Sequence, residues 1–557
     1  MTLPTSHPVS APNHARGIST MNLPPALTRQ SDRSVTLDGD VISEHIVDIA
    51  LLPGERWWGG SATDGVSMPF GATEFARDLR GPSDFTDGLG TPSNQASSAL
   101  VSTAGRAIGS CHPFRFNITK GRMRVEGREL RLVLAGTTLR DGYLAAAREF
   151  FPASGQAPAR DLFAAPQYNT WIDQPYVPTQ DSVLRYAEEI LASGMPPGVL
   201  YIDDSWGPDY GTWRFDRARF PDPAAMVTRL HDLGFSVMLW VVPFVSPDSF
   251  SFRELEKRGL LVRNSTGDTA VRRWWNGLSA VLDLSNDAAI RWITDQLDAV
   301  MDESGVDGFK FDGGDVRDFR HDDITAGDLE PVQMCHAWSR VGLRYPFNEF
   351  RASWNMGGQA LGQRLQDKPP AWDETGIGSL IPEMLAQGMA GYAFTCPDMI
   401  GGGEIDAMSE LSGIDQEFFV RYAQLAALAP MAQFSVVPSR VLDAEHLDAV
   451  RESMRIRAEH TPLILDLVDQ AARTGEPVVR PMAYHAPGLT DVTDQFFLGT
   501  DVVVAPVLQR GATERRVQIP AGTWRGPDDR IVTGPVEVTV ACGLRTLPIF
   551  ERVTQEA

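Results

Sequence analysis

The sequence predicts an α/β protein built around a (β/α)8 TIM barrel, with one β-sandwich before the barrel and a second one after it. Two observations lead to this fold class. Apolar strand patterns alternate with amphipathic helix patterns from about residue 161 to residue 475, as expected for parallel strands joined by helices. Shorter runs of alternating apolar and polar residues, separated by turn residues, occupy both flanks.

We therefore expect four parts along the chain. They are an arm without stable structure over residues 1–33, an N-terminal β-sandwich over 34–160, the barrel over 161–475 and a C-terminal β-sandwich over 476–557. The arm is rich in Pro, Ser, Thr and Asn, a composition with little apolar surface to bury. It lacks a basic segment followed by an apolar one, so we expect no signal peptide.

Composition excludes several classes of partner. The 557 residues carry a net charge of −22, which argues against nucleic acid or an anionic membrane as a partner. No apolar run reaches the roughly 18 residues of a membrane span. The four cysteines are scattered without a CxxC spacing, which predicts neither a disulfide framework nor a zinc site and favours a reducing, cytoplasmic location. A homo-oligomer remains open.

The N-terminal flank contains alternating runs at residues 34–37, 45–50 and 129–134, with a turn at residues 38–39. Trp57 and Trp58 are followed by two glycines. Aromatic rings beside flexible backbone suit a loop that stacks on sugars, with Trp58 as the candidate contact. A pair of core tryptophans at a turn is an equally good interpretation.

The barrel region provides eight candidate strands. They are residues 167–172, 199–204, 235–242, 308–312, 345–350, 360–366, 391–395 and 432–436. Helices are predicted over 182–193, from Asp222 and Pro223 onward, and over 286–304, because Asp and Asn suit N-caps and Pro suits the first helical position. The C-terminal flank predicts strands at 501–507 and 516–520, followed by a turn at 520–523.

The stretch from residue 306 to residue 315 is central to the functional interpretation. Strand side chains alternate between faces, so Lys310 and Asp312 share one face while Phe309 and Phe311 share the other. A carboxylate at the C-terminal end of a barrel strand, beside a cation, suits a nucleophile or a base. A purely structural Lys–Asp pair fits this stretch equally well.

Other polar side chains and several tryptophans lie near the predicted strand ends. The polar ones are Asp203, Asp204, Lys310, Asp312, Arg351, Asp367 and Asp398, and the tryptophans are Trp171, Trp206, Trp240, Trp274, Trp275 and Trp372. Carboxylates bind sugar hydroxyls and aromatic faces cover sugar C–H groups, so this set predicts a sugar pocket. No metal-ligand spacing, GxGxxG or P-loop is present, which predicts chemistry by two carboxylates without metal or cofactor. Asp203 or Asp398 taken alone also suits a helix cap.

Several runs resemble glycoside hydrolase family 31. They are residues 201–204, 220–223, 239–243, 281–284, 308–312, 397–402, 475–481 and 498–507. Within the family the chain is most similar to the branch of myogenesis-regulating glycosidases, through residues 273–277, 310–312 and 433–435. This resemblance implies a retaining, exo-acting α-glycosidase, with an α-galactoside as the substrate. α-Glucosidase, α-xylosidase, transglycosylase and a non-catalytic sugar-binding protein on the same fold are the alternatives.

The resemblance also implies residue roles. Asp312 matches the nucleophile, and Arg351 matches the arginine before the acid/base loop. The family's acid/base aspartate precedes a tryptophan by five residues, which selects Asp367 before Trp372 over Asp373. Asp204 and Arg351 are expected to hold ring hydroxyls, and the tryptophans to wall the pocket. The α-glucosidase members carry Arg-Asn-His where this chain has residues 433–435, Gln-Phe-Ser, a departure that argues against a glucoside.

Overall fold

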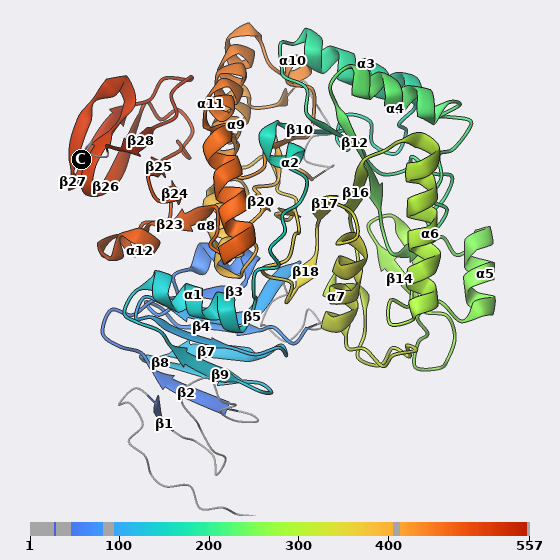
Figure 1. Cartoon of the computed structure of the whole chain (residues 1–557), viewed down its shortest axis with the longest axis horizontal. Helices are drawn as coiled ribbons and strands as arrows, with labels where there is room; N and C mark the ends of the chain where they lie inside the picture. Colours follow the sequence, from blue (N-terminus) through green and yellow to red (C-terminus); the bar gives the residue numbers. More distant parts are fainter. Residues whose placement is uncertain (1–26, 29–45, 82–93, 405–412, 554–557) are drawn as a thin grey trace, which may run out of the picture.

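The computed structural model describes residues 27–28, 46–81, 94–404 and 413–553. Figure 1 shows the N-terminal sheets in blue and cyan, the barrel in green and yellow, and a C-terminal sheet in red. The strand expected at 34–37 and the turn at 38–39 lie outside the described residues. Part of the expected arm is ordered, because β1 (Leu27–Thr28) pairs antiparallel with the free edge of β2 (Ile46–Ala50).

Two sheets form the N-terminal part. One has the order β1-β2-β8-β7-β4, and the other has the order β18-β5-β6-β9, with β3 paired to β5. Their further bounds are β3 Trp57–Ser61, β4 Phe75–Asp78, β5 Gln95–Ser102, β6 Arg106–Gly109, β7 Arg115–Thr119, β8 Arg122–Glu126 and β9 Arg131–Leu134. The strand β18 (Ser353–Trp354) comes from a barrel loop, so the barrel and this part share a sheet. The helix α1 (Leu139–Glu149) packs on β5 and β6.

The centre of the molecule is the predicted (β/α)8 barrel, a nine-stranded parallel sheet that is nearly closed. Its strands are β10 Gln167–Asn169, β11 Val199–Ile202, β12 Ser236–Val241, β16 Gly308–Phe311, β17 Phe347–Phe350, β19 Gln363–Arg364, β20 Thr395–Cys396, β21 Met399–Ile400 and β22 Gln433–Phe434. The seventh barrel position is split, because β20 pairs with β19 whereas β21 pairs with β22. Pro397 and Asp398 separate the two halves, and Asp398 has a left-handed φ of 63°.

Helices surround the barrel (Figure 1). They are α3 Gln180–Ala192, α4 Pro223–Asp232, α6 Asp287–Ser304, α7 Pro331–Gly342, α8 Ile377–Met389, α9 Gln416–Ala427 and α11 Ala444–Thr474. The predicted N-caps are present: Asp222 accepts from the backbone N–H of Ala225 at 3.0 Å, and Asn286 accepts from that of Ala288 at 2.9 Å. Shorter helices are α2 Asp161–Ala164, α5 Phe250–Arg258, α10 Pro438–Val441 and α12 Met482–His485.

A small antiparallel sheet is inserted between β12 and α6. It has the order β13-β15-β14, with β13 at Phe244–Val245, β14 at Val271–Trp274 and β15 at Gly277–Val281. The turn between β14 and β15 carries Trp275 and Asn276. The insertion therefore brings two polar or aromatic side chains to the carboxyl end of the barrel.

The C-terminal part is one six-stranded antiparallel sheet around a core of its own, in the order β23-β24-β25-β28-β26-β27. Its bounds are β23 Val479–Pro481, β24 Phe496–Leu498, β25 Val502–Val504, β26 Glu514–Arg525, β27 Ile531–Ala541 and β28 Ile549–Arg552. The turn predicted at 520–523 is wrong, because β26 continues through these residues with a register shift between Ile519 and Gly522. Pro520 lacks an N–H and Gly522 has a φ of 120°, so both suit a bulge.

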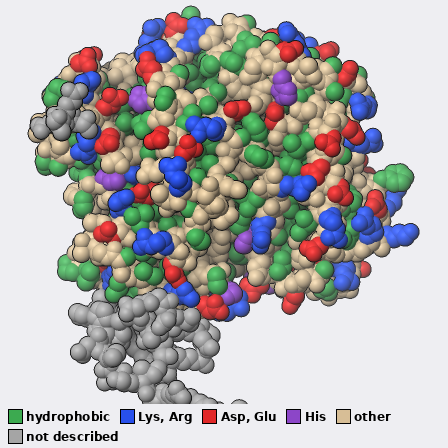
Figure 2. Space-filling model, in the orientation of Figure 1, with side chains coloured by type: hydrophobic (Ala, Val, Ile, Leu, Met, Phe, Trp, Pro, Cys, Tyr) green, Lys and Arg blue, Asp and Glu red, His purple; other side chains and the backbone are tan. Residues whose placement is uncertain are grey.

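Charged side chains of both signs are interspersed on the face of the molecule shown in Figure 2. Among the described residues, no helix combines the length and the apolar character that a membrane span requires.

Candidate functional site

A cavity of about 460 Å³ lies at the carboxyl ends of the barrel strands. It is lined by Trp171, Tyr176, Asp203, Trp240, Trp275, Lys310, Asp312, Arg317, Arg351, Gln366, Asp367, Met399, Gly403 and Glu404. Asp203, Trp240, Lys310 and Asp312 are buried and form the floor, whereas the side chains of Tyr176 and Trp275 are about 40% exposed and form the mouth. The structure thus brings eight of the fourteen predicted pocket residues to one cavity: Trp171, Asp203, Trp240, Trp275, Lys310, Asp312, Arg351 and Asp367.

Asp312 directly follows β16 and is held by two donors. Its Oδ2 accepts from Nε1 of Trp240 at 2.7 Å, and its Oδ1 accepts from the backbone N–H of Gly313 at 2.8 Å. Gly313 has a φ of 59°, and a Cβ there would come within 2.8 Å of the ring of Phe244. Glycine is therefore required at the turn that presents the carboxylate. The two donated hydrogen bonds fix the orientation of the carboxylate at the cavity floor.

Lys310 lies on the face of β16 that the alternation predicts, but its direct partner differs from the expected one. Its Nζ contacts Oδ2 of Asp203 at 2.7 Å, and both side chains are buried. Burial lowers the pKa of Lys310, but the carboxylates around it, first Asp203 and then Asp312 and Glu349, together more than offset burial, so the pKa is raised overall. Lys310 is therefore a charged group that acts on Asp312 only across space.

Arg351 connects the two expected catalytic carboxylates. Its Nε lies 3.2 Å from Oδ2 of Asp315 and 3.6 Å from Oδ1 of Asp312, and its Nη1 lies 3.7 Å from Oδ2 of Asp367. Its guanidinium also stacks on the ring of Trp275, 4.8 Å from the centroid. A single rigid cation therefore contacts both carboxylates and one wall of the cavity.

Asp367, and not Asp373, faces the cavity. Asp373 is exposed and accepts from the backbone N–H of Thr375 at 2.9 Å, as a residue at the start of a helix does. Asp367 accepts from Nη1 of Arg364 at 2.5 Å. Burial raises the pKa of Asp367, but Arg364 and then Arg351 more than offset burial, so the pKa is lowered overall. The geometry therefore favours the sequence-based choice of acid/base.

Six predicted residues do not line the cavity. Two of them, Trp206 and Trp274, are buried, and their indole N–H groups donate to the carbonyl of Trp240 and to the hydroxyl of Ser279. The other four are Trp58, Trp372, Asp204 and Asp398. Trp58 is 4% exposed and packs in the N-terminal core, so its expected sugar contact is corrected: the side chain is buried in another part of the molecule. Nε1 of Trp372 donates to Oδ2 of Asp415 at 3.0 Å. Asp204 accepts from the hydroxyl of Tyr210, and burial together with Asp203 raises the pKa of Asp204 to about 7.

The fourth of these residues, Asp398, is fully buried behind the cavity wall. Its Oδ1 accepts from Nη1 of Arg364 at 2.7 Å, and its Oδ2 accepts from the backbone N–H of Lys368 at 2.8 Å. Asp398 is therefore one contact away from Asp367 rather than in contact with the cavity. The prediction that Asp398 contacts the sugar directly is therefore wrong, because its side chain lies behind the cavity wall.

Sequence reasoning missed Arg364, Glu349, Arg317 and Tyr176. Arg364 and Glu349 are buried charges inside strands, and their ion pair measures 3.1 Å. A charged residue in a predicted buried strand is the signal that could have identified them. Arg317 lines the cavity, and within the described ranges it makes no hydrogen bond or ion pair through its side chain. Tyr176 follows no strand pattern, so the sequence offered no signal for it.

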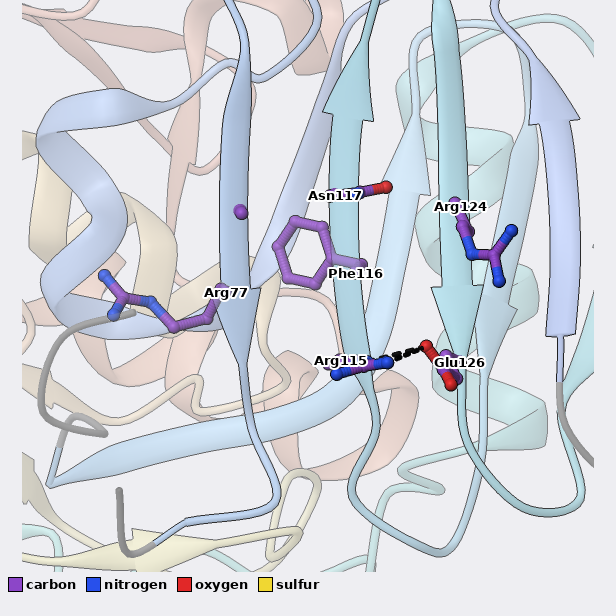
Figure 3. Close-up of a pocket in the computed structure, with 7 residues that line it drawn as sticks. Arg77, Arg115, Phe116, Asn117, Arg124 and Glu126 are labelled. Carbon is purple, nitrogen blue, oxygen red and sulfur yellow. Dashed lines mark hydrogen bonds and ion pairs between the residues drawn. The ribbon is translucent and has the colours of Figure 1, made fainter. Parts of the chain in front are cut away.

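A second cavity of about 310 Å³ lies on the N-terminal sheet (Figure 3). Its lining comes from β4, β7 and β8, and Figure 3 shows the ion pair between Arg115 and Glu126 at its edge. Arg77, which also lines it, donates through Nε to Asp64 at 2.8 Å. None of the predicted site residues lies there, so this cavity does not compete with the one in the barrel.

Two family models match most of the chain. The model described as "Glycosyl hydrolases family 31 TIM-barrel domain" matches residues 162–467, and the one described as "Glycosyl hydrolase family 31 C-terminal domain" matches residues 475–554. The chain belongs to glycosyl hydrolase family 31. For this family 31 member, the predicted family and barrel fold are therefore confirmed.

Curated relatives include the myogenesis-regulating glycosidase of Mus musculus, 36% identical over 68% of this chain and 54% of that protein. The alpha-xylosidase XylQ of Lactiplantibacillus pentosus is 24% identical over 62% of this chain and 47% of that protein. This family 31 chain thus spans about half the length of these two relatives.

Solved structures share the fold. A Flavobacterium johnsoniae family 31 dextranase complexed with glucose superimposes with a TM-score of 0.81 at 18% identity, over 94% of this chain and 68% of that one. A family 31 sulfoquinovosidase from E. rectale gives a TM-score of 0.78 at 18% identity, over 93% and 84% of the two chains.

Proposed function

We propose that this family 31 chain is a retaining, exo-acting α-glycosidase. The observation that carries the proposal is the pair of carboxylates, Asp312 and Asp367, at one cavity and on either side of Arg351. Two carboxyl groups on opposite sides of a bound sugar are the machinery of a retaining glycosidase. A buried floor and an exposed mouth suit a terminal sugar that enters with its ring first and keeps its leaving group outside.

In the first step, Asp312 attacks the anomeric carbon while Asp367 donates a proton to the glycosidic oxygen. The product is a covalent glycosyl-enzyme through an ester to Asp312. Asp312 is held in place for this attack, because Trp240 and Gly313 donate to it and Arg351 lies near it. In the second step Asp367 takes a proton from water, the water oxygen attacks the anomeric carbon, and Asp312 leaves as a carboxylate.

The floor of the cavity is suited to hold the hydroxyls of the terminal sugar. Asp203 and Lys310 present an acceptor and a donor that are already paired with each other, so their positions are set before a sugar binds. The exposed ring of Trp275 and the indole of Trp171 offer faces for the sugar C–H groups. The indole N–H of Trp171 donates to the carbonyl of Gly403 at 3.0 Å, which orients that ring.

We propose an α-galactoside as the preferred substrate. The support is the 36% identity to the myogenesis-regulating glycosidase, whose branch is α-galactosidase-like, together with the departure at residues 433–435. Gln433 donates to Glu349 at 2.5 Å and the hydroxyl of Ser435 donates to the carbonyl of Ile400 at 2.9 Å. Both side chains are buried within the barrel, and neither lines the cavity.

An α-xylosidase or α-glucosidase of the same mechanism is the second candidate, because relatives at 23–24% identity include enzymes named for these activities. Transglycosylation would use the same carboxylates, and one relative is named an isomaltosyltransferase. Hydrolysis of 4-nitrophenyl α-galactoside, α-glucoside, α-xyloside and α-N-acetylgalactosaminide, followed by NMR of the sugar product, tests the proposal. We expect the α-galactoside to react fastest, with the α-anomer as the first product. Inactivity on all four, with sugar binding retained, would favour a non-catalytic sugar-binding protein.

A further inference from the structure

Arg364 is a buried cation with several carboxylate neighbours. Its Nη1 donates to Oδ1 of Asp367 at 2.5 Å and also to Oδ1 of Asp398 at 2.7 Å, while its Nε donates to Oε1 of Glu349 at 3.1 Å. Because one nitrogen bonds both Oδ1 atoms, the two aspartates lie next to each other. We infer that Arg364 is a positioning residue that couples Asp367 to Asp398, so that these two carboxyl groups share the proton used in catalysis. The inference rests on the proposed acid/base role of Asp367.

The split of the seventh barrel strand places Asp398 in this position. The left-handed φ of 63° at Asp398 breaks the strand and turns the side chain toward Arg364, and the backbone N–H of Lys368 holds its second oxygen. Gly403 packs against the carboxyl groups of Asp367 and Asp398. A Cβ on Gly403 would lie 2.7 Å from Oδ1 of Asp367 and 2.9 Å from Oδ1 of Asp398. A side chain at this position would push the carboxylates apart, so glycine permits their close approach.

Asp367 and Asp398, together with the groups around them, include more carboxylates than cations. The groups that face this pair are Lys310 on β16, Asp312 directly after β16, Glu349 on β17, Arg351 after β17, Cys396 on β20 and Tyr422 on α9. Burial raises the pKa of Cys396 and that of Tyr422 well above their ordinary values, so both stay neutral. Within the described residues, Arg364 bonds three carboxylates, so a proton on one of them reduces the unpaired negative charge around this cation.

The preferred site of that proton follows from the surroundings. Burial, together with the nearby Asp367, raises the pKa of Asp398 to about 7, whereas Arg364 and Arg351 keep the pKa of Asp367 low. Without substrate, Asp398 is the protonated partner and Asp367 is ionised. When the proton moves to Asp367, Asp398 becomes the anion and keeps its bond from Arg364, so the buried charge is unchanged. Asp398 thus stores the proton at neutral pH, and Asp367 delivers it to the glycosidic oxygen.

Two substitutions should move the pH profile in opposite directions. Asp398→Asn removes the carboxyl group that stores the proton and leaves Asp367 beside Arg364 and Arg351. The pKa of Asp367 should then fall, so the basic limb of kcat/KM should move to lower pH by about one unit or more. In Arg364→Met the cation next to Asp367 is lost, so the same limb should move to higher pH. Opposite shifts from two neighbouring residues are not expected from a general loosening of the site. Shifts in the same direction, or none, would overturn the inference.

Controls separate coupling from damage to the fold. Asp64→Asn removes another buried aspartate, which pairs with Arg77 in the N-terminal part, and should leave the basic limb unchanged. Thermal unfolding shows whether each variant folds. If Arg364→Met does not fold, Arg364→Lys keeps the charge but loses the two-pronged geometry. Arg364→Lys should lower kcat, while the basic limb of its kcat/KM profile should stay near the wild-type position. A shifted basic limb in this variant, which keeps the positive charge, would contradict the coupling.

A readout without substrate keeps the inference distinct from the proposed function. In protein labelled with ¹³C at the aspartate carboxyls, several NMR resonances should titrate near neutral pH, because the pKa values of Asp204 and Asp318 are also raised to about 7. One of these resonances should disappear in Asp398→Asn and shift in Arg364→Met, while those of Asp204 and Asp318 remain. If no glycoside is hydrolysed, the proposed function fails, yet this titration still tests the coupling. Independent titration of Asp367 and Asp398 in the wild type would overturn it.

Discussion

Two buried arginines, one in the N-terminal part and one in the barrel, are paired in different ways. Arg106 forms a one-to-one pair with Glu55: its Nε donates to Oε1 at 2.8 Å and its Nη2 donates to Oε2. Arg364 in the barrel divides its donors among Glu349, Asp367 and Asp398. All these side chains are buried except that of Asp367, which is 25% exposed at the cavity, so burial of the arginine alone does not distinguish a structural pair from a functional one.

The difference lies in the balance of charge. The pair of Arg106 and Glu55 is neutral and its donors and acceptors face each other, so nothing is left to bind a ligand or a proton. The network around Arg364 has more carboxylates than cations in direct contact, and it ends at a cavity through Asp367. Such an imbalance costs stability, and it persists where a function uses it. The comparison predicts that changes in the barrel network alter activity, whereas changes in the N-terminal pair alter stability.

The largest effect is expected for Asp312→Ala. This variant should be inactive on a disaccharide and also on a dinitrophenyl glycoside, because no leaving group compensates for a missing nucleophile. Release of dinitrophenolate under steady-state and pre-steady-state conditions measures it. Residual turnover of the dinitrophenyl substrate close to that of Asp367→Ala would contradict the assignment of Asp312.

Asp367→Ala should show a smaller loss that depends on the leaving group. A disaccharide needs the proton, so its kcat/KM should fall by about 10²–10⁴-fold, the usual contribution of general acid catalysis. Dinitrophenolate leaves without a proton, so a burst should precede a slow steady state, in which water attacks without its base. Equal losses on both substrates would contradict the acid/base role.

Glu55→Gln tests the other side of the comparison. It leaves the buried guanidinium of Arg106 without a counter-charge, so the free energy of unfolding should fall by about 3–5 kcal/mol. Chemical denaturation at neutral pH measures the change. The pH profile of kcat/KM of the folded variant should match that of the wild type, and a shifted profile would show that the N-terminal pair is linked to the site.

The smallest effect is expected for Lys310→Met. Loss of a positive charge disfavours ionised carboxylates nearby, so the acidic limb of kcat/KM should move to higher pH. Because Lys310 contacts Asp203 directly and Asp312 only across space, we expect a shift of at most about one unit. An unshifted limb with a raised KM would leave Lys310 as a sugar ligand only.

Local sequence determined much of this protein. The alternation around Lys310 and Asp312 predicted a strand with both residues on one face, and capping residues predicted where α4 and α6 begin. The spacing between Asp367 and Trp372 selected the carboxylate that the structure places at the cavity. These features depend on neighbours within a few positions along the chain, which a sequence displays directly.

Only the tertiary structure decided which partners the buried charges have. Lys310 pairs with Asp203, more than a hundred residues away, and Arg364 joins carboxylates from three different strands or loops. Trp58 packs in the N-terminal core, although a tryptophan beside glycines suits a sugar-binding loop as well as a core. Such contacts depend on how strands line up around the barrel and on a break in one of them at Asp398. The energy of a buried charge depends on the groups that surround it in space, and these come from distant parts of the chain.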